Sequence, residues 1–455
     1  MKPTAGADYT LAPNNNRLGH IPGDYGMPLL GKTFPLFKDP CGTYERHHLK
    51  NGRTSKMSVN GIKTLLLVGP EHAQDLFMDS QKRYSSQMGW SGFMGDFFQG
   101  GVLMRDFDEH RIQRRIMQSA FKNQALKHYV AGINQISQQS IHAWQQQQQI
   151  TAFNEVKLLL LRIAFEVFCY TRPDSEELPR INQAFIDMLE ATTAIIRKDW
   201  PGLLYRRGMN GRRTLYRFFK SLVEEKRAGN SQDMMSHFCR ETKENGDYFN
   251  DVEIAEHMIF LMLAAHDTTA SVTTMALYYL AAHPEWQEKL HQEANNLSQG
   301  EARYEDVFNG MPDTQLVLHE TLRLHPAVST TYRRTIRDSE IDGHFVPAHT
   351  MLTCPIQYNH RMQEYWQQPN DFRPERFGET VAEHKQHPFL WTPFGGGAHK
   401  CIGMHFAELL FKTTMANLLR EHRVSFARGN YYPARIDYLP FTKPHDGLSL
   451  RVEKR

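Results

Sequence analysis

The residues best suited to chemistry lie in a glycine-rich run, Phe394 to Gly403, near the C-terminal end of the chain. Glycines at positions 395, 396 and 397 allow backbone angles that other residues avoid, so the main chain can pass close to a flat, bulky group. Cysteine-only metal sites need several thiolates at short spacing, but no second cysteine is close to Cys401. The pattern therefore excludes zinc and iron–sulfur centres. It favours a single thiolate, which haem iron accepts as a ligand that promotes O–O cleavage.

A cysteine taken alone is more often a small buried apolar residue. Here Phe394, Gly397, Cys401 and Gly403 have the spacing of the cysteine loop of haem-thiolate monooxygenases, so the chain resembles the cytochromes P450. The resemblance implies that Cys401 is the axial iron ligand of haem b (iron protoporphyrin IX), with Phe394 against the cofactor.

A second motif lies within an apolar run, residues 251–281, that predicts one long helix. From the residues alone, the Thr268 hydroxyl could bond back to a carbonyl one turn earlier. The run Ala264 to Thr269 resembles the family's oxygen-activation motif, which implies that Thr268 hydrogen-bonds dioxygen or an attendant water and that Asp267 relays protons. The family usually has glycine where Ala265 stands, so its extra methyl bears on the width of the oxygen groove.

Glu320 and Arg323 lie three residues apart on one predicted helix face, a pair that contributes only a few tenths of a kcal/mol when exposed. The sequence Leu324-His325-Pro326 and the run Phe372 to Phe377 follow in the family's order. The resemblance implies a buried cluster of Glu320, Arg323 and Arg376 that braces the cysteine loop.

Haem carries two propionates, which require cations or strong hydrogen-bond donors. Any one such residue alone is more often an ordinary surface residue, but four match the family's propionate positions: His110, Arg114, Arg333 and His399. The family more often has tryptophan at the position of His110.

Three basic residues are expected to face away from the haem. Arg111 and Arg115 lie one helical step around from His110 and Arg114, and Lys400 precedes the thiolate. They are either solvated surface or, as we hypothesise, a patch that docks an acidic electron donor of the ferredoxin or flavodoxin type, itself served by a reductase.

Composition sets the remaining limits. The 455 residues contain no linker, which predicts a flexible segment over 1–20 and one domain over 21–455. The 53 basic and 50 acidic residues nearly cancel, which argues against a nucleic-acid partner. Five cysteines without paired spacing suit a reducing, cytoplasmic compartment. No apolar run is long enough for a transmembrane anchor.

The expected fold class is mainly α with small β sheets. A strand pair over 55–68 turns at Asn60-Gly61, helical periodicity dominates residues 70–297, and short strands return around residues 336–352. Five consecutive glutamines, 145–149, are interpreted as a solvated helix face. The resemblance implies the family's single-domain triangular prism around a buried haem.

Two segments correspond to the family's distal pocket: Met88 to Phe98, with Trp90, Phe93, Phe97 and Phe98, and Ala327 to Tyr332. Core packing is an equal alternative for each aromatic side chain. If they line a pocket, the substrate is apolar and lipid-like: a sterol, terpenoid or fatty acid. The overall pattern is similar to branches that include sterol demethylases, retinoic-acid hydroxylases and their bacterial relatives.

The segment Ile195 to Arg227 corresponds to the family's substrate-entry lid and mixes apolar with basic residues. A solvated helix face is the ordinary explanation, and peripheral contact with an anionic membrane is the alternative.

The function expected from these features is that of a haem-thiolate monooxygenase, which inserts one oxygen atom from O2 into an apolar molecule with electrons from a separate partner. Two alternatives stay open. One keeps the haem but performs peroxygenation or isomerisation, and the other is a haem-based binding or sensor protein without turnover.

Overall fold

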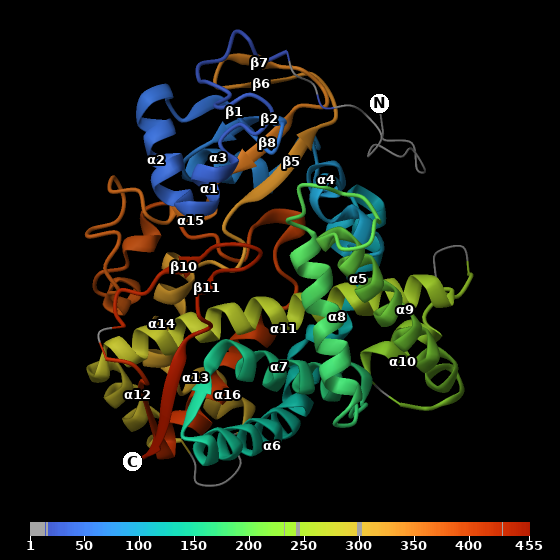
Figure 1. Ribbon diagram of the computed structural model, residues 1–455, viewed down its shortest axis with the longest axis vertical. Coiled ribbons are helices and arrows are strands. Elements are labelled where there is room, and N and C mark those ends of the chain that lie inside the picture. The colour runs from blue at the N-terminus through green and yellow to red at the C-terminus, as the bar shows by residue number, and fades with distance from the viewer. Residues whose placement is uncertain (1–13, 15–16, 232, 243–245, 298–302, 430) are drawn as a thin grey trace.

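The computed structural model describes residue 14 and residues 17–455, apart from 232, 243–245, 298–302 and 430. Helices fill most of the molecule, and a small sheet lies at one end (Figure 1). The helices are α1 Thr33–Lys38, α2 Pro40–Asn51, α3 Pro70–Met78, α4 Ser86–Phe98, α5 Phe107–Gln118, α6 Asn123–Gln147, α7 Ala152–Cys169, α8 Glu177–Ala191, α9 Leu204–Ala228, α10 Met234–Arg240, α11 Asp251–Ala282, α12 Pro284–Asn296, α13 Tyr304–Asn309, α14 Pro312–Leu324, α15 Ile356–Asn359 and α16 Met404–Glu421.

The strands form four small sheets, and the expected fold class, mainly α with small sheets, is confirmed. None of the helices in the described residues combines the length and apolar composition that crossing a membrane requires. The strands are β1 Thr54–Val59, β2 Ile62–Leu67, β3 Tyr84–Ser85, β4 Gln149–Thr151, β5 Thr331–Thr335, β6 Ser339–Ile341, β7 His344–Val346, β8 Met351–Cys354, β9 His422–Phe426, β10 Ile436–Asp437, β11 Lys443–Pro444 and β12 Ser449–Lys454.

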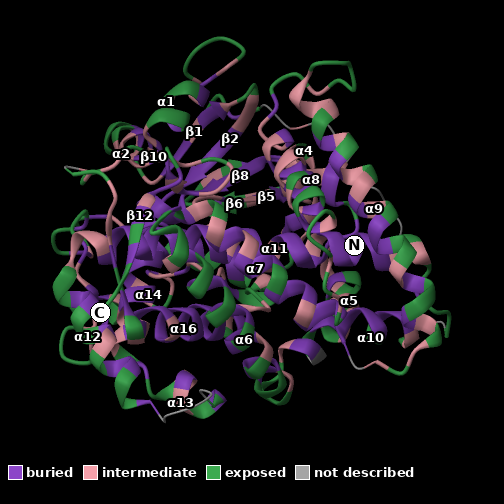
Figure 2. Ribbon diagram, turned by 60° about the horizontal axis from the view of Figure 1, so that its bottom comes forward, coloured by how far each residue is buried: buried purple, intermediate pink, exposed green. Residues whose placement is uncertain are grey.

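Helix α11 runs through the middle of the molecule and is buried along most of its length (Figure 2). It begins with a capping box, in which the Asn250 side chain accepts from the Glu253 N–H and the Glu253 carboxylate accepts from the Asn250 N–H. Its flanks pack against α7, α9, α14 and α16. The single long helix predicted over 251–281 is thus confirmed to within one residue.

The largest sheet has the strand order β1-β2-β8-β5-β3. The predicted hairpin at Asn60-Gly61 is present, and both turn residues have positive φ, as a tight two-residue turn requires. Of the segment predicted to be flexible, residues 1–13, 15 and 16 lie outside the described residues. Leu18 is fully buried, and the Asn14 side chain donates to the Lys63 carbonyl at 2.7 Å.

The prediction for the five glutamines was wrong at its C-terminal end. Helix α6 ends at Gln147, Gln148 takes a left-handed φ of 61°, and Gln149 begins β4, where it pairs with Arg451 of β12. The side chains are largely exposed, as expected. The helix ends because the backbone of this segment completes a sheet with the last strand of the chain.

The predicted buried cluster is confirmed. Arg323 Nε lies 2.7 Å from one oxygen of Glu320, and Arg376 Nε lies 3.0 Å from the other. All three side chains have no exposed surface. Glu383, which the sequence did not single out, accepts from Arg376 at 2.6 Å. The cluster thus contains two carboxylates and two guanidinium groups.

The cluster is connected to the cysteine loop through His360. Arg323 donates to the His360 carbonyl at 2.9 Å, and the ring Nε2 of His360 accepts from the Thr392 N–H, also at 2.9 Å. Burial, reinforced by the Arg323 charge, lowers the pKa of His360 to about 3. The ring is therefore neutral at physiological pH, and its Nε2 can act as the acceptor that fixes the chain just before Phe394.

Replacing Glu320 with Gln is expected to lower the free energy of unfolding by about 3–5 kcal/mol, because two buried guanidinium groups lose their shared anion. The matched control is Glu375→Gln, since Glu375 is exposed and its nitrogen–oxygen distance to Lys289 is 3.9 Å. The control should lose less than about 1 kcal/mol. Urea denaturation followed by tryptophan fluorescence measures both, and equal losses would contradict the stabilising role.

Candidate active site

The glycines of the cysteine loop are required by close packing on α3. Gly397 has a φ of +60°, and a Cβ there would lie 1.9 Å from the carbonyl oxygen of Phe77. Gly395 is also left-handed, with a φ of +65°. The predicted approach of the loop to a flat group stays a prediction, and among the described residues the glycines of the loop come closest to the Phe77 backbone.

The loop holds Cys401 by its own backbone. The Cys401 N–H donates to the Phe394 carbonyl at 2.8 Å, and the Gly403 N–H bonds to the sulfur just before α16 begins. Burial raises the pKa of the Cys401 thiol, while the Gly403 N–H and the nearby Arg114 charge lower it. The helix N-terminus also favours the anionic sulfur.

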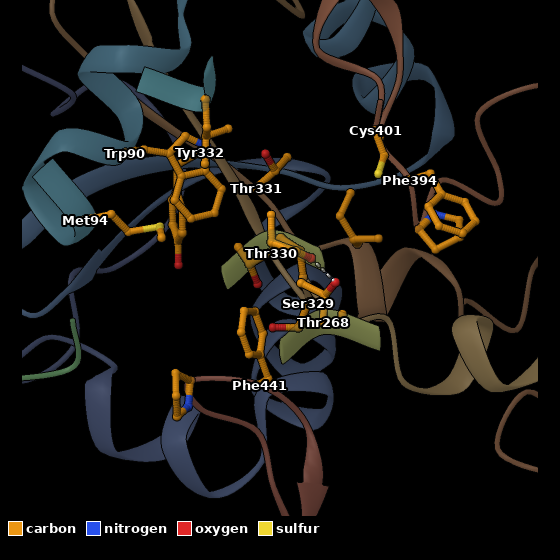
Figure 3. Close-up of a pocket in the computed structure, with 18 of the residues that line it drawn as sticks. Trp90, Met94, Thr268, Ser329, Thr330, Thr331, Tyr332, Phe394, Cys401 and Phe441 are labelled. Atoms are coloured by element: carbon orange, nitrogen blue, oxygen red, sulfur yellow. Dashed lines mark hydrogen bonds between the residues drawn. The ribbon is translucent and has the colours of Figure 1, made fainter. Parts of the chain in front are cut away.

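Figure 3 shows the Cys401 sulfur pointing into a cavity, with Thr268 on the facing helix, α11. The cavity has a volume of about 490 Å³. Within the described part of the chain, no group of three or more His, Cys, Asp or Glu side chains could hold a metal ion.

Thr268 combines the two interpretations drawn from the sequence. Its side chain lines the cavity, and its hydroxyl donates to the Ala264 carbonyl one turn earlier at 2.7 Å. The proton of this hydroxyl is thereby directed away from the cavity, so the oxygen is left as an acceptor. Ala265 also lines the cavity, so its methyl occupies part of the wall beside Thr268.

Asp267 lies on another face of α11 and does not line the cavity. Its carboxylate is fully buried and lies 2.5 Å from the ammonium nitrogen of Lys157 on α7. The neighbouring His266 ring is 3.3 Å from the same carboxylate, and its Nδ1 bonds to the Met262 carbonyl. The sequence analysis missed Lys157, although a lysine inside the otherwise apolar run of α7 is the signal that could have identified it.

The structure brings the four predicted propionate ligands together beside Cys401. The His110 and His399 rings lie 3.9 Å apart between centroids, tilted by 32°, and Arg333 and His399 line the cavity. Burial, together with Arg114, lowers the pKa of His110 to about 4, and burial with Arg333 lowers that of His399 well below its ordinary value. Both rings are thus neutral N–H donors near pH 7.

The charges at this end of the cavity fit a group with acidic side chains. Arg114 and Arg333 are at least partly buried, yet neither guanidinium forms an ion pair with a carboxylate in the residues that the structure describes. Of the acids near these cations, Asp106 lies 4.0 Å from His399 and is already bonded to the Ser86 N–H, and Asp79 accepts from the Arg83 and Tyr84 N–H groups. The cations are therefore available to a partner that is not part of the chain, as haem propionates would be.

The two segments predicted to line the pocket behave differently. Trp90 and Phe93 line the cavity, whereas Phe97 and Phe98 are buried in the main hydrophobic core. All residues from Ala327 to Tyr332 line the cavity. The core-packing interpretation is thus confirmed for Phe97 and Phe98, and the pocket-wall interpretation for Trp90 and Phe93.

The three residues of the predicted basic patch are exposed, as expected. Arg111 makes an ion pair with Asp108 of its own helix at 3.4 Å, while His110 on the same helix is buried. Arg115 and Lys400 are also exposed. The two faces of α5 are therefore separated as the helical periodicity predicted.

Comparisons with known proteins agree with this geometry. The family model for cytochrome P450 matches residues 22–435. A Mycobacterium tuberculosis protein described as cytochrome P450 136 is 34% identical over 97% of this chain and 90% of its own, and Bos taurus cytochrome P450 26B1 is 27% identical over 94% and 86%. A taxane 10-beta-hydroxylase from Taxus cuspidata is 26% identical over 85% and 80%.

The fold agrees as well. A cyanobacterial CYP120A1 structure with retinoic acid bound superimposes with a TM-score of 0.87, at 22% identity, over 96% of this chain and 99% of the other. Together with the family model, which covers most of the sequence, and the cysteine that faces the cavity, these matches lead to one conclusion. The chain belongs to the cytochrome P450 family and is a haem-dependent monooxygenase.

Proposed function

We propose that this protein inserts one oxygen atom from O2 into an apolar, lipid-like substrate at a haem b held by Cys401. The observation that carries the proposal is that the Cys401 sulfur and the Thr268 hydroxyl face the same, largely apolar cavity. Relatives named for a taxane or solved with retinoic acid, a carboxylic acid, act on or bind molecules with large apolar skeletons, which supports a lipid-like skeleton and says nothing about its polar group.

Each residue of the proposed haem site has its own role. When bound, the haem supplies the oxidising chemistry. Cys401 supplies an anionic ligand whose charge the Gly403 N–H stabilises. His110, Arg114, Arg333 and His399 bind the propionates. The apolar walls exclude water, and the oxygen of Thr268 accepts a hydrogen bond from a water that carries protons into the site.

Two measurements test the assignment. Carbon monoxide added to the reduced protein should shift the main haem absorption band to the red, as a thiolate ligand requires. Substrate-stimulated, NAD(P)H-dependent oxygen uptake with surrogate redox partners should distinguish a monooxygenase from a peroxygenase, an isomerase or a sensor. An absent thiolate band would overturn the assignment of Cys401, and absent oxygen uptake would overturn monooxygenation.

Replacing Thr268 with Ala should keep oxygen consumption but divert it to peroxide, because the acceptor that orients the water is lost. The yield of product per oxygen consumed should fall by at least about tenfold. Thr274→Ala is the control, since Thr274 is buried on the same helix but does not line the cavity. Unchanged coupling in Thr268→Ala would contradict the assigned role.

Asp267 is proposed to move protons toward Thr268. Because Asp267 also forms an ion pair with Lys157, variants of the pair can separate its effect on the stability of the fold from its effect on the rate of product formation. Asp267→Asn should slow product formation by about 100-fold and, by stranding Lys157, destabilise the fold by about 3–5 kcal/mol. The double variant Lys157→Met, Asp267→Asn should regain stability but not rate. Denaturation and single-turnover product formation measure the two effects. A normal rate in Asp267→Asn would make the pair purely structural.

The electron donor is proposed to be an acidic ferredoxin or flavodoxin that docks on Arg111, Arg115 and Lys400. Reversing the three charges to Glu should slow reduction by such a donor by about tenfold at low salt, with a smaller effect at high salt. Equivalent reversals at exposed Lys38, Arg46 and Lys50, on α1 and α2, are the control. Stopped-flow reduction measures the rate, and an unchanged rate would leave the patch as solvated surface.

Peripheral membrane contact near the predicted lid stays a prediction. Most of its arginines are in ion pairs: Arg207 with Asp187 at 2.6 Å, for example, and Arg213 with Asp199 at 2.8 Å. Such pairs weaken attraction to anionic lipids. Contact would therefore depend on the exposed apolar side chains between α8 and α9, which are Ile195, Ile196 and Trp200.

A further inference from the structure

The charges around the cavity are confined to one end. Among the described residues that line it, Arg333 and His399 are the only basic side chains, and no carboxylate lines it. Both belong to the group beside Cys401 that is proposed to bind the propionates.

Two cations just behind the lining are already paired. Lys32, next to the lining residue Thr33, lies 2.9 Å from Asp24. Arg197, two residues beyond the lining residue Ile195, lies 2.8 Å from Asp96 and also donates to the Phe93 carbonyl. A carboxylate that entered the cavity would thus lose its water without meeting a basic lining side chain away from the propionate site, which is unfavourable.

One wall nevertheless offers hydrogen bonds. Ser329, Thr330, Thr331 and Tyr332 are four consecutive hydroxyl residues that line the cavity where the chain passes from α14 into β5 (Figure 3). We call them the hydroxyl row. Thr330 approaches the Tyr44 hydroxyl at 3.5 Å, a long and weak contact.

Tyr332 is the residue of the row best placed to hold a ligand oxygen. Its ring packs against Trp90 and Phe93, at centroid distances of 5.2 and 4.7 Å, which fixes its direction. Its hydroxyl has no hydrogen-bond partner among the described residues. Burial raises the pKa of Tyr332 to about 12, so the hydroxyl keeps its proton and can donate it near pH 7.

We propose that the substrate enters as a neutral molecule with a hydroxyl or carbonyl oxygen that binds the hydroxyl row, and that free carboxylates are excluded. The inference rests on the proposed function for the position of the haem and narrows its substrate class. A sterol or terpenoid alcohol, ketone or ester fits this chemistry, whereas an ionised fatty acid does not.

Three probes with one carbon chain test the exclusion: dodecanoic acid, its methyl ester and 1-dodecanol. Their dissociation constants for the haem-loaded protein come from ligand-induced shifts of the haem absorption band. At pH 8 the acid should bind at least about tenfold more weakly than the ester and the alcohol. The difference should shrink as pH falls toward 5, because the acid becomes neutral. An acid that binds as tightly as the ester at pH 8 overturns the exclusion.

Variants of the hydroxyl row test the contact itself. Tyr332→Phe keeps the ring and removes one hydroxyl, so it should weaken 1-dodecanol by about fivefold to tenfold while leaving dodecane, which has no oxygen, unchanged. Tyr432→Phe, outside the cavity and half exposed, is the matched control. Two results together would show that the hydroxyl row does not bind the ligand oxygen. Tyr332→Phe would change the affinities for 1-dodecanol and dodecane equally or not at all, and the double variant Thr330→Val, Thr331→Val would do the same.

The outcomes are distinguishable from those of the proposed function. Ligand binding requires no turnover, so the selectivity can fail while substrate-stimulated oxygen uptake persists. Conversely, oxygen uptake can be absent while the preference for neutral ligands holds. The selectivity of the cavity would then stand, although the proposed monooxygenation would not.

Discussion

The Cys401 thiol lies beside a largely apolar cavity, and the proposed haem site depends on holding its sulfur there as an anion. Burial disfavours the charged form of Cys401, and nearby dipoles and charges reduce this cost: the Gly403 N–H, the N-terminus of α16 and the guanidinium of Arg114. These groups act only if the loop keeps its shape. The Gly397 contact with Phe77 and the link from Arg323 through His360 to Thr392 hold that shape from two sides.

The central helix separates two polar environments by a single residue step. Successive residues point about 100° apart around a helix, so Thr268 reaches the cavity while Asp267 meets Lys157 of α7. An unpaired carboxylate at this depth would cost several kcal/mol, and Lys157 supplies the counter-charge. A proton that moves from Asp267 to the cavity must then pass along the helix surface or through water. The Asp267–Lys157 pair is therefore the step of the proposed proton path with the least direct connection to the cavity.

The sequence predicted the fold class, the long helix and the hairpin at Asn60-Gly61, because each rests on local periodicity or turn chemistry. The Glu320 cluster was predicted only from the resemblance to the cytochromes P450. The sequence failed where the partner is remote. Gln149 forms a strand only because β12, at the far end of the chain, pairs with it. Lys157 finds its partner across the fold, and no local pattern relates it to Asp267. Glu383 was also missed, although its partner Arg376 lies only seven residues away in the sequence. Phe97 and Phe98 were ambiguous because core and pocket walls select the same aromatic residues.

Charge segregation connects binding of the cofactor with choice of substrate. The cations that suit two propionates gather around His110 and His399, and in the proposed site they would pair with the propionates there. Farther along the cavity, polarity comes from neutral hydroxyls, Tyr332 foremost. A ligand that carried its own negative charge would compete for Arg333 with the cofactor, whereas a neutral oxygen would not. In the proposed site, the same separation of charge that suits the cofactor would therefore select against acidic substrates, without any residue dedicated to repelling them.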